Sequence, residues 1–177
     1  IVYIKMTIDE KKGANSEEKQ KVKDIVKKVV PNSEAYTAAY GTREEYSFGG
    51  GGRTVTSTTK YWYYGVAFKP GDLYLVPLSF EGGDVSYSEP LHFQKGDLGM
   101  AETKNGLLVL YGKDRKELMN LFVVASNTKE DKYHPVNIQQ KEEAEAFMQF
   151  AQSFAQEINA ANGITDIKAA KKEARKG

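Results

Sequence analysis

The chain has 177 residues, carries 25 lysines and arginines against 24 aspartates and glutamates, and contains no cysteine. Its length suits one domain that buries about 70% of the surface of the unfolded chain, and its apolar fraction of 40% is that of a globular protein. The missing cysteines exclude disulfides, thiolate nucleophiles and cysteine-bound zinc, and the net charge of +1 excludes a strong global field for nucleic acid. We therefore expect no nucleic-acid partner.

Positive charge is concentrated at the two ends of the chain. Residues 1–30 carry eight lysines against five acids, and the segment from Lys168 to Lys176 carries five cations. We divide the chain into an N-terminal segment 1–15, where alternating apolar residues predict a short edge strand, a single domain 16–160, and a basic tail 161–177 that is helical or frayed. We expect a cytoplasmic location. Because the sequence starts at Ile1 and not at Met, a removed signal or anchor stays an alternative.

Residues 16–30 are predicted to form the first helix of the domain. Ser16 is placed as its N-cap, and Pro31 ends it. Its apolar positions recur at helical spacing and form one stripe: Val22, Ile25, Val26, Val29 and Val30. The valines have only moderate helix propensity, so we expect this helix to depend on contact with a core.

From residue 34 to residue 125 the apolar period changes to two, which predicts strands. Turn residues separate them, and Asn105-Gly106 is the clearest two-residue hairpin turn. Seven or eight consecutive strands with short links indicate an antiparallel barrel or sandwich within an α+β fold. The predicted strands are 35–40, 44–48, 54–68, 73–80, 85–93, 98–103, 107–111 and 118–124.

Residues 138–160 are predicted to form a long amphipathic helix that closes the fold. Asn137 is placed as its cap, and Gly163 is expected to end it. Phe150 lies off the main apolar stripe, so an exposed Phe150 would mark a second contact surface.

Patterns of catalysis and metal binding are missing from the sequence. It has no Gly-x-Ser-x-Gly and no His-Glu-x-x-His motif, and its two histidines, His92 and His134, are far apart. Acids near turns, such as Asp72, are not spaced as a calcium loop and are expected to be solvated. We therefore expect no enzyme, no catalytic residue, no metal and no cofactor.

Two local features are candidates for interaction. The run Gly49–Gly52 suits a phosphate loop by composition, but no Gly-Lys-Ser or Gly-Lys-Thr follows, which favours a hairpin loop with Arg53 at its base. In the run Tyr61-Trp62-Tyr63-Tyr64, alternate residues face opposite sides of a strand. Such aromatic residues either fill a core or anchor an interface.

The order of elements resembles the pleckstrin-homology-like (PH-like) superfold in its bacterial form. The residues that carry the resemblance are the helix end and first strand, 29–41, and the closing strand 118–124 with the helix that follows. The likeness covers about residues 16–160 and implies a small barrel filled by side chains. Trp62 lies in a strand and not in the closing helix, and no basic phosphoinositide signature is present, so the resemblance assigns no lipid-site residue.

We predict a non-catalytic interaction module that binds a protein or peptide partner. One alternative is peripheral association with an anionic membrane surface through the basic flanks. Another is a helix-grip domain that encloses an apolar small molecule. The candidate interaction residues are Arg53, Tyr61, Trp62, Tyr63, Tyr64 and Phe150.

Overall fold

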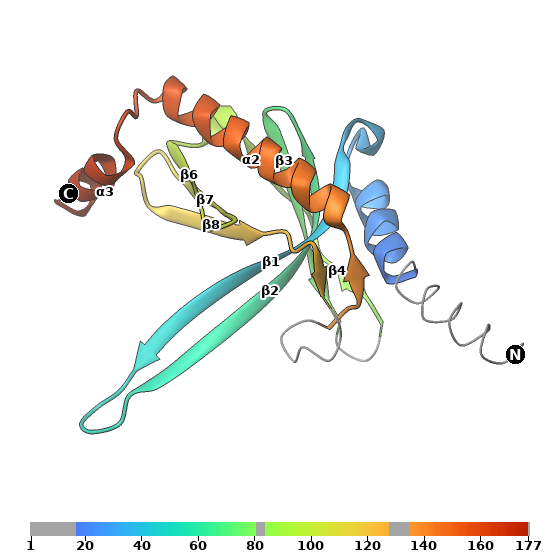
Figure 1. The fold of residues 1–177 in the computed structure, drawn as a ribbon, viewed down its shortest axis with the longest axis horizontal. Helices are drawn as coiled ribbons and strands as arrows, with labels where there is room; N and C mark the ends of the chain where they lie inside the picture. The colour runs from blue at the N-terminus through green and yellow to red at the C-terminus, as the bar shows by residue number, and fades with distance from the viewer. Residues whose placement is uncertain (1–16, 81–83, 128–134, 177) are drawn as a thin grey trace, which may run out of the picture.

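The computed structural model describes residues 17–80, 84–127 and 135–176. Its α+β fold begins with a helix, described over residues 17–29, continues with antiparallel strands, and closes with a long helix, as the sequence predicts (Figure 1). A short 3-10 turn, η1 (Ser33–Ala35), leads into the strands. The other elements are β1 (Thr37–Gly49), β2 (Thr56–Lys69), β3 (Asp72–Ser79), β4 (Ser86–Tyr87), β5 (Leu91–Gln94), η3 (Lys95–Asp97), β6 (Met100–Lys104), β7 (Leu107–Tyr111), β8 (Glu117–Phe122), β9 (Ser126–Asn127), β10 (Ile138–Gln139), α2 (Lys141–Ala161) and α3 (Ile167–Lys176).

Eight strands form one antiparallel sheet in the order β4-β3-β2-β1-β8-β7-β6, with β5 also paired to β3. Most strands that follow one another in the chain are therefore neighbours in the sheet, which confirms the predicted meander. The first and last long strands, β1 and β8, meet at the single pair Thr42↔Phe122. The two-residue turn between β6 and β7 has positive φ at both Asn105 and Gly106, as its sequence predicts.

Two predictions about the strands are wrong. The predicted strands 35–40 and 44–48 are one strand, β1, which begins at Thr37 and runs through Gly41. A Cβ atom at Gly41 would lie 2.7 Å from Val66 Cγ2 and 3.0 Å from Leu121 Cδ1, so the glycine permits close contact between strands. The predicted strand 85–93 is split into β4 and β5, because Pro90 between them has no backbone N–H to pair.

Helix α2 covers one face of the sheet (Figure 1). Phe147 and Phe150 lie against Phe68 of β2, with ring centroids 5.4 Å and 5.2 Å apart. Full burial of one such side chain contributes about 1.5–3 kcal/mol. The buried residues of the helix are Ala144, Phe147, Phe150, Ala151, Phe154, Ala155 and Ile158.

The N-terminal helix covers the opposite face of the sheet. Val26 is buried with Ala67 of β2 and Val76 of β3. The residues next to these two in their strands, such as Phe68, belong to the core under α2, so Ala67 and Val76 face the other side of the sheet. A Cβ atom at Gly65 would lie 2.9 Å from Val26 Cγ2, so this glycine lets the helix approach β2. The predicted helix is confirmed where the structure describes it, whereas the Ser16 cap and the edge strand in segment 1–15 lie outside the described residues.

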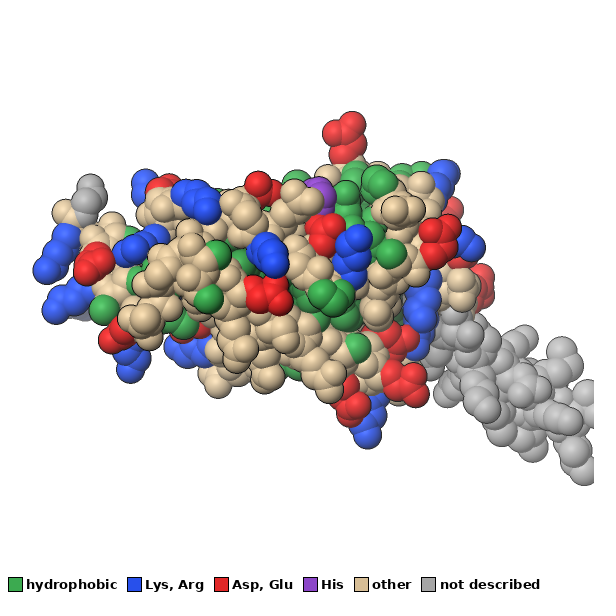
Figure 2. Space-filling model, turned by 90° about the horizontal axis from the view of Figure 1, so that it is seen from above, with side chains coloured by type: hydrophobic (Ala, Val, Ile, Leu, Met, Phe, Trp, Pro, Cys, Tyr) green, Lys and Arg blue, Asp and Glu red, His purple; other side chains and the backbone are tan. Residues whose placement is uncertain are grey.

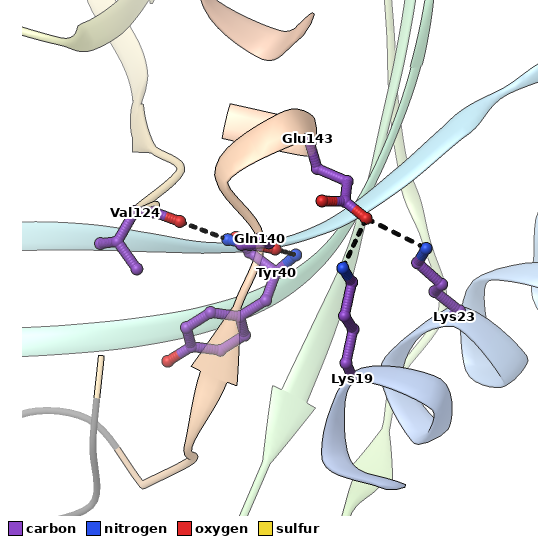
Figure 3. A network of polar contacts seen from close by, with 6 residues as sticks. All are labelled: Lys19, Lys23, Tyr40, Val124, Gln140 and Glu143. Carbon is purple, nitrogen blue, oxygen red and sulfur yellow. Dashed lines mark hydrogen bonds and ion pairs between the residues drawn. The ribbon is translucent and has the colours of Figure 1, made fainter. Parts of the chain in front are cut away.

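Helix α2 begins three residues later than predicted. Ile138–Gln139 form β10, and Gln140, not Asn137, occupies the N-cap position. The Gln140 side chain is buried, and its amide makes hydrogen bonds with backbone groups of two other segments (Figure 3). It accepts from the Tyr40 N–H (2.9 Å) and donates to the carbonyl oxygens of Tyr40 (2.8 Å) and Val124 (2.7 Å). At the other end, Gly163 has a φ of 66° and follows the helix as predicted.

An ion-pair cluster joins the N-terminal helix to the first turn of α2 (Figure 3). The Glu143 carboxylate lies 2.8 Å from Lys19 Nζ and 3.1 Å from Lys23 Nζ. Burial alone would raise the pKa of Glu143, but the hydrogen bonds from the two ammonium groups and from the backbone outweigh it and lower that pKa.

The basic tail forms the helix α3 from Ile167 to Lys176. Ala170 is buried against Val109 and Tyr111, on the face of the sheet opposite α2. The Lys171 ammonium contacts the Glu102 carboxylate, which also accepts from the Tyr111 hydroxyl (3.2 Å). The tail is therefore a docked helix and not a frayed end.

Candidate functional site

The β1–β2 hairpin extends as an arm well beyond the rest of the sheet (Figure 1). Its two strands stay paired from Thr37↔Phe68 to Gly49↔Thr56. Their other neighbours stop much earlier, because β8 pairs with β1 only at Thr42 and β3 pairs with β2 no further than Tyr63. Within the described chain, residues 43–49 and 56–62 thus form a two-stranded ribbon with both outer edges unpaired by strands. We call this ribbon and its loop the arm.

The tip of the arm is a glycine-rich loop between Gly49, where β1 ends, and Thr56, where β2 begins. A Cβ atom at Gly50 would lie 2.5 Å from the Thr54 carbonyl oxygen, and Gly52 has a φ of 83°, which favours glycine. The hairpin-loop interpretation of Gly49–Gly52 is confirmed. Arg53 is exposed and lies within the loop, not at its base as the sequence predicts, because β2 begins only at Thr56.

Three apolar side chains near the tip are exposed: Phe48 (79%), Val55 (78%) and Tyr46 (64%). Phe48 pairs with Ser57 and Tyr46 with Thr59, so the residues directly opposite them are small and polar. The Tyr46 hydroxyl donates to the Glu44 carboxylate, and this hydrogen bond raises the pKa of Tyr46. Solvent-exposed aromatic residues on a projecting ribbon are typical of an interaction surface.

Sequence reasoning chose a different aromatic set, the run Tyr61–Tyr64. Tyr64 is buried in the α2-side core, and Trp62 is half-buried against the same core. Tyr63 stacks on Tyr40 with ring centroids 6.4 Å apart and meets Phe80 edge-on at 5.6 Å. Tyr61 is half-buried at the base of the arm. Trp62, Tyr63 and Tyr64 therefore fix the arm to the body, and the exposed set lies farther out.

A signal for the exposed set was present in the sequence. Between residues 43 and 60 the apolar side chains are few, and the second strand is Thr- and Ser-rich. Such strands cannot bury either face. Tyr46, Phe48 and Val55 are the exceptions in this polar segment.

Phe150, proposed as part of a second contact surface if exposed, is 9% exposed. Its ring stacks on Phe154 with centroids 4.9 Å apart and also contacts Phe68 and Phe147. The apolar stripe of α2 is simply wider than the strict spacing suggests, because the helix lies flat on the sheet. Its aromatic face contributes chiefly to the core.

Arg43 lies at the base of the arm, where β1 leaves β8. Its guanidinium carbon is 5.0 Å from the centre of the Trp62 ring, a cation–π contact. The Arg43 Nε atom is buried and has no hydrogen-bond partner among the described residues. Burial raises the pKa of Tyr64, and the nearby Arg43 partly offsets this effect.

A groove of about 370 Å³ runs beside this base, between the arm and strands β7 and β8. Leu107 and Val109 line it on the face opposite α2, since the alternate residues Leu108 and Leu110 belong to the α2-side core. The polar and aromatic lining residues are Arg43, Glu44, Glu45, Tyr46, Glu117 and Asn120.

A separate polar cluster lies at the β3–β5 edge. Asp72 accepts a hydrogen bond from the Tyr36 hydroxyl and also contacts His92 Nε2. The His92 ring stacks on Tyr74 with centroids 3.9 Å apart. The expectation of a solvated Asp72 is wrong, because strand pairing brings the histidine to it, and this side chain is only 13% exposed. His134 lies outside the described residues.

Within residues 17–80, 84–127 and 135–176, no group of three or more acidic or histidine side chains is placed to hold a metal ion. In the same part of the chain, no helix combines the length and apolar character needed to cross a membrane. Comparison of the sequence and structure with protein-family models, curated proteins and solved structures found no significant match.

Proposed function

We propose that the protein is a non-catalytic interaction module that binds a protein or peptide partner through the arm. The observation that carries the proposal is the projecting ribbon, which presents Tyr46, Phe48 and Val55 to solvent. Exposed aromatic residues supply most of the energy of many interfaces, and an unpaired strand edge supplies backbone groups for a partner. The body of the domain acts as the scaffold that holds the arm.

Membership of the PH-like superfold is part of this proposal. Its support is the order of elements: a helix, a meander in which β1 meets β8, and the closing helix α2. Domains of that superfold include peptide binders and scaffolds, so the resemblance agrees with an interaction role without specifying one.

Association with an anionic membrane is less favoured by the distribution of cations. The N-terminal helix and α3 lie at opposite ends of the molecule (Figure 1), and Figure 2 shows acids and cations interspersed between them. Several flank lysines are paired within the chain: Lys19 and Lys23 with Glu143, and Lys171 with Glu102. An intramolecular pair leaves less charge for a lipid surface.

A helix-grip domain with an apolar ligand is also less favoured. Such a domain needs space between its long helix and its sheet. Here Phe147 and Phe150 contact Phe68 and each other, and Phe154 contacts Phe150, so this cluster fills part of the space below α2. A hollow of about 400 Å³, lined by Phe68, Phe150 and Phe154, lies beside it. This contact cluster favours a solid core.

Site-specific photo-crosslinking in cells of the protein's source tests the proposal. A photoreactive residue in place of Phe48 is expected to give a discrete protein adduct, whereas the same residue in place of the exposed Lys172 on α3 gives none. Identical adduct patterns at both positions, or none at position 48, would contradict a binding role for the arm.

A further inference from the structure

The backbone N–H and C=O groups of β1 that point away from β2 have three kinds of hydrogen-bond partner along the strand. At Tyr40 the backbone N–H and C=O both bond to the Gln140 side chain (2.9 Å and 2.8 Å). At Thr42 the edge pairs with Phe122 of β8. At Glu44 the backbone N–H donates to Asn120 Oδ1 (3.3 Å). Every second residue of β1 thus directs its backbone groups away from β2.

This alternation continues into the arm. Backbone N–H and C=O groups in an antiparallel strand point to opposite sides at successive residues. Tyr46 and Phe48 are therefore expected to direct theirs to the same side as Glu44, and within the described residues no strand pairs with them there. Asn120 belongs to β8, and its side-chain amide takes the place of a backbone partner at Glu44. Beyond Glu44 the edge is therefore a position for one more strand.

The groove at the base of the arm provides surroundings for the side chains of such a strand. Leu107 and Val109 form an apolar lining beside the edge, and Tyr46 adds an aromatic ring. An added strand turns alternate side chains toward one face, so every second residue of an occupant reaches this lining.

The charged residues that line the groove favour one class of ligand. The groove is lined by three carboxylates, those of Glu44, Glu45 and Glu117, and by one guanidinium, that of Arg43. Arg43 is turned onto the Trp62 ring. The excess of negative charge is complementary to a basic ligand.

We propose that the groove and the free edge of β1 bind a basic peptide in extended conformation, which adds as a strand at Tyr46 and Phe48. This inference rests on the proposed function and specifies its partner class. Apolar residues at alternate positions of the peptide face Leu107 and Val109, and its cationic residues face the three glutamates.

Two other occupants are alternatives that the test separates. Residues 46–71 contain three cations and no acid, so an acidic peptide suits the tip of the arm. A second copy of the chain can also pair edge to edge with the first.

The test starts from short random peptides displayed on phage and selected on the full chain. Synthetic versions of the recovered peptides are then measured by fluorescence anisotropy against two variants. Tyr46→Pro removes one outward N–H without touching the β1–β2 ladder. It is expected to bind about tenfold or more weakly than Tyr46→Thr, because both variants lose the tyrosine ring of the groove and only the first loses the N–H. Tyr46→Thr keeps the N–H and strand propensity and is the matched control, and urea unfolding of both variants verifies that they fold.

A second measurement needs no change in the fold. If the peptide pairs through one edge, only every second backbone N–H of the peptide points toward β1. N-methylation of the odd-numbered residues and of the even-numbered residues should therefore differ: one pattern abolishes binding and the other preserves it. The triple variant Glu44→Gln, Glu45→Gln, Glu117→Gln is expected to weaken basic peptides and to reduce the salt dependence of binding.

Selected peptides that are basic, sensitive to Tyr46→Pro and sensitive to one methylation phase support the inference. Selection of acidic or uncharged peptides, insensitivity to Tyr46→Pro, or recovery of no peptide would overturn it. A dimer in sedimentation that Tyr46→Pro dissociates, without peptide binding, would assign the edge to a second copy and also overturn it. The proposed function is judged separately, by the crosslink at position 48.

Discussion

The inner and outer halves of the β1–β2 hairpin have the same strand pairing in opposite surroundings. In the inner half, Tyr40 and Val66 are fully buried, because helices cover both faces of the sheet. In the outer half, Phe48 is 79% exposed and its partner Ser57 is exposed too. A two-stranded ribbon alone is marginally stable in water. The inner half therefore holds the fold together, and the outer half is available for contact.

The largest expected contrast compares one phenylalanine from each region. Phe147→Ala should lower the free energy of unfolding by about 3–5 kcal/mol, since this side chain is fully buried against Phe68. Phe48→Ala should change it by less than about 0.5 kcal/mol. Urea unfolding measures both. Similar losses for the two variants would contradict the division between body and arm.

The buried amide that joins α2 to β1 comes next. Gln140→Met keeps the length of the side chain but leaves the N–H and C=O of Tyr40 without their partner, which should cost about 2–3 kcal/mol. Gln139→Met changes the exposed neighbouring residue and should be nearly neutral. Equal stability of the two variants in urea unfolding would show that the amide bridge contributes nothing.

The glycines of the two regions should also differ. Gly41→Ala places a methyl group 2.7 Å from Val66 Cγ2 and should cost about 1–3 kcal/mol through overpacking. Gly51→Ala on the arm meets no atom within 4 Å and should leave stability within about 0.5 kcal/mol. Thermal unfolding of both variants tests this pair, and a neutral Gly41→Ala would refute the close contact of β1 with β2.

The smallest effect is electrostatic and depends on pH. Because the pKa of Glu143 in the folded chain is lowered, its contribution is complete above about pH 5 and is lost as the pH falls through the folded-state pKa. Glu143→Gln should therefore cost about 0.5 kcal/mol at neutral pH and nothing in strong acid. Urea unfolding over a pH series measures this, with Glu142→Gln as the control. A cost that does not depend on pH would exclude the ion pairs as its cause.

Much of the fold could be predicted from the sequence, because period and turn chemistry are local signals. The helix at residues 17–29, the turn at Asn105-Gly106 and the stop at Gly163 are examples. The start of α2 could not, since Gln140 is placed by backbone groups of Tyr40 and Val124, far away in the sequence.

The candidate site was harder to predict than the fold. An aromatic run such as Tyr61–Tyr64 is conspicuous in sequence, but its burial depends on where the covering layers end. The arm emerges because β8 and β3 stop pairing at Thr42 and Tyr63, which is a property of the tertiary structure. Only the polar composition around Tyr46 and Phe48 indicated in advance that these side chains stay exposed.

Shortening the arm tests the central claim most directly. Tyr46 to Thr59 are removed, and Asn-Gly joins Glu45 to Lys60, a pair that faces across the hairpin. We predict a chain whose free energy of unfolding changes by less than about 1 kcal/mol, because the removed residues bury little, and whose affinity for the selected peptides falls about tenfold or more. A shortened chain that fails to fold, or that binds those peptides as the full chain does, would contradict the account.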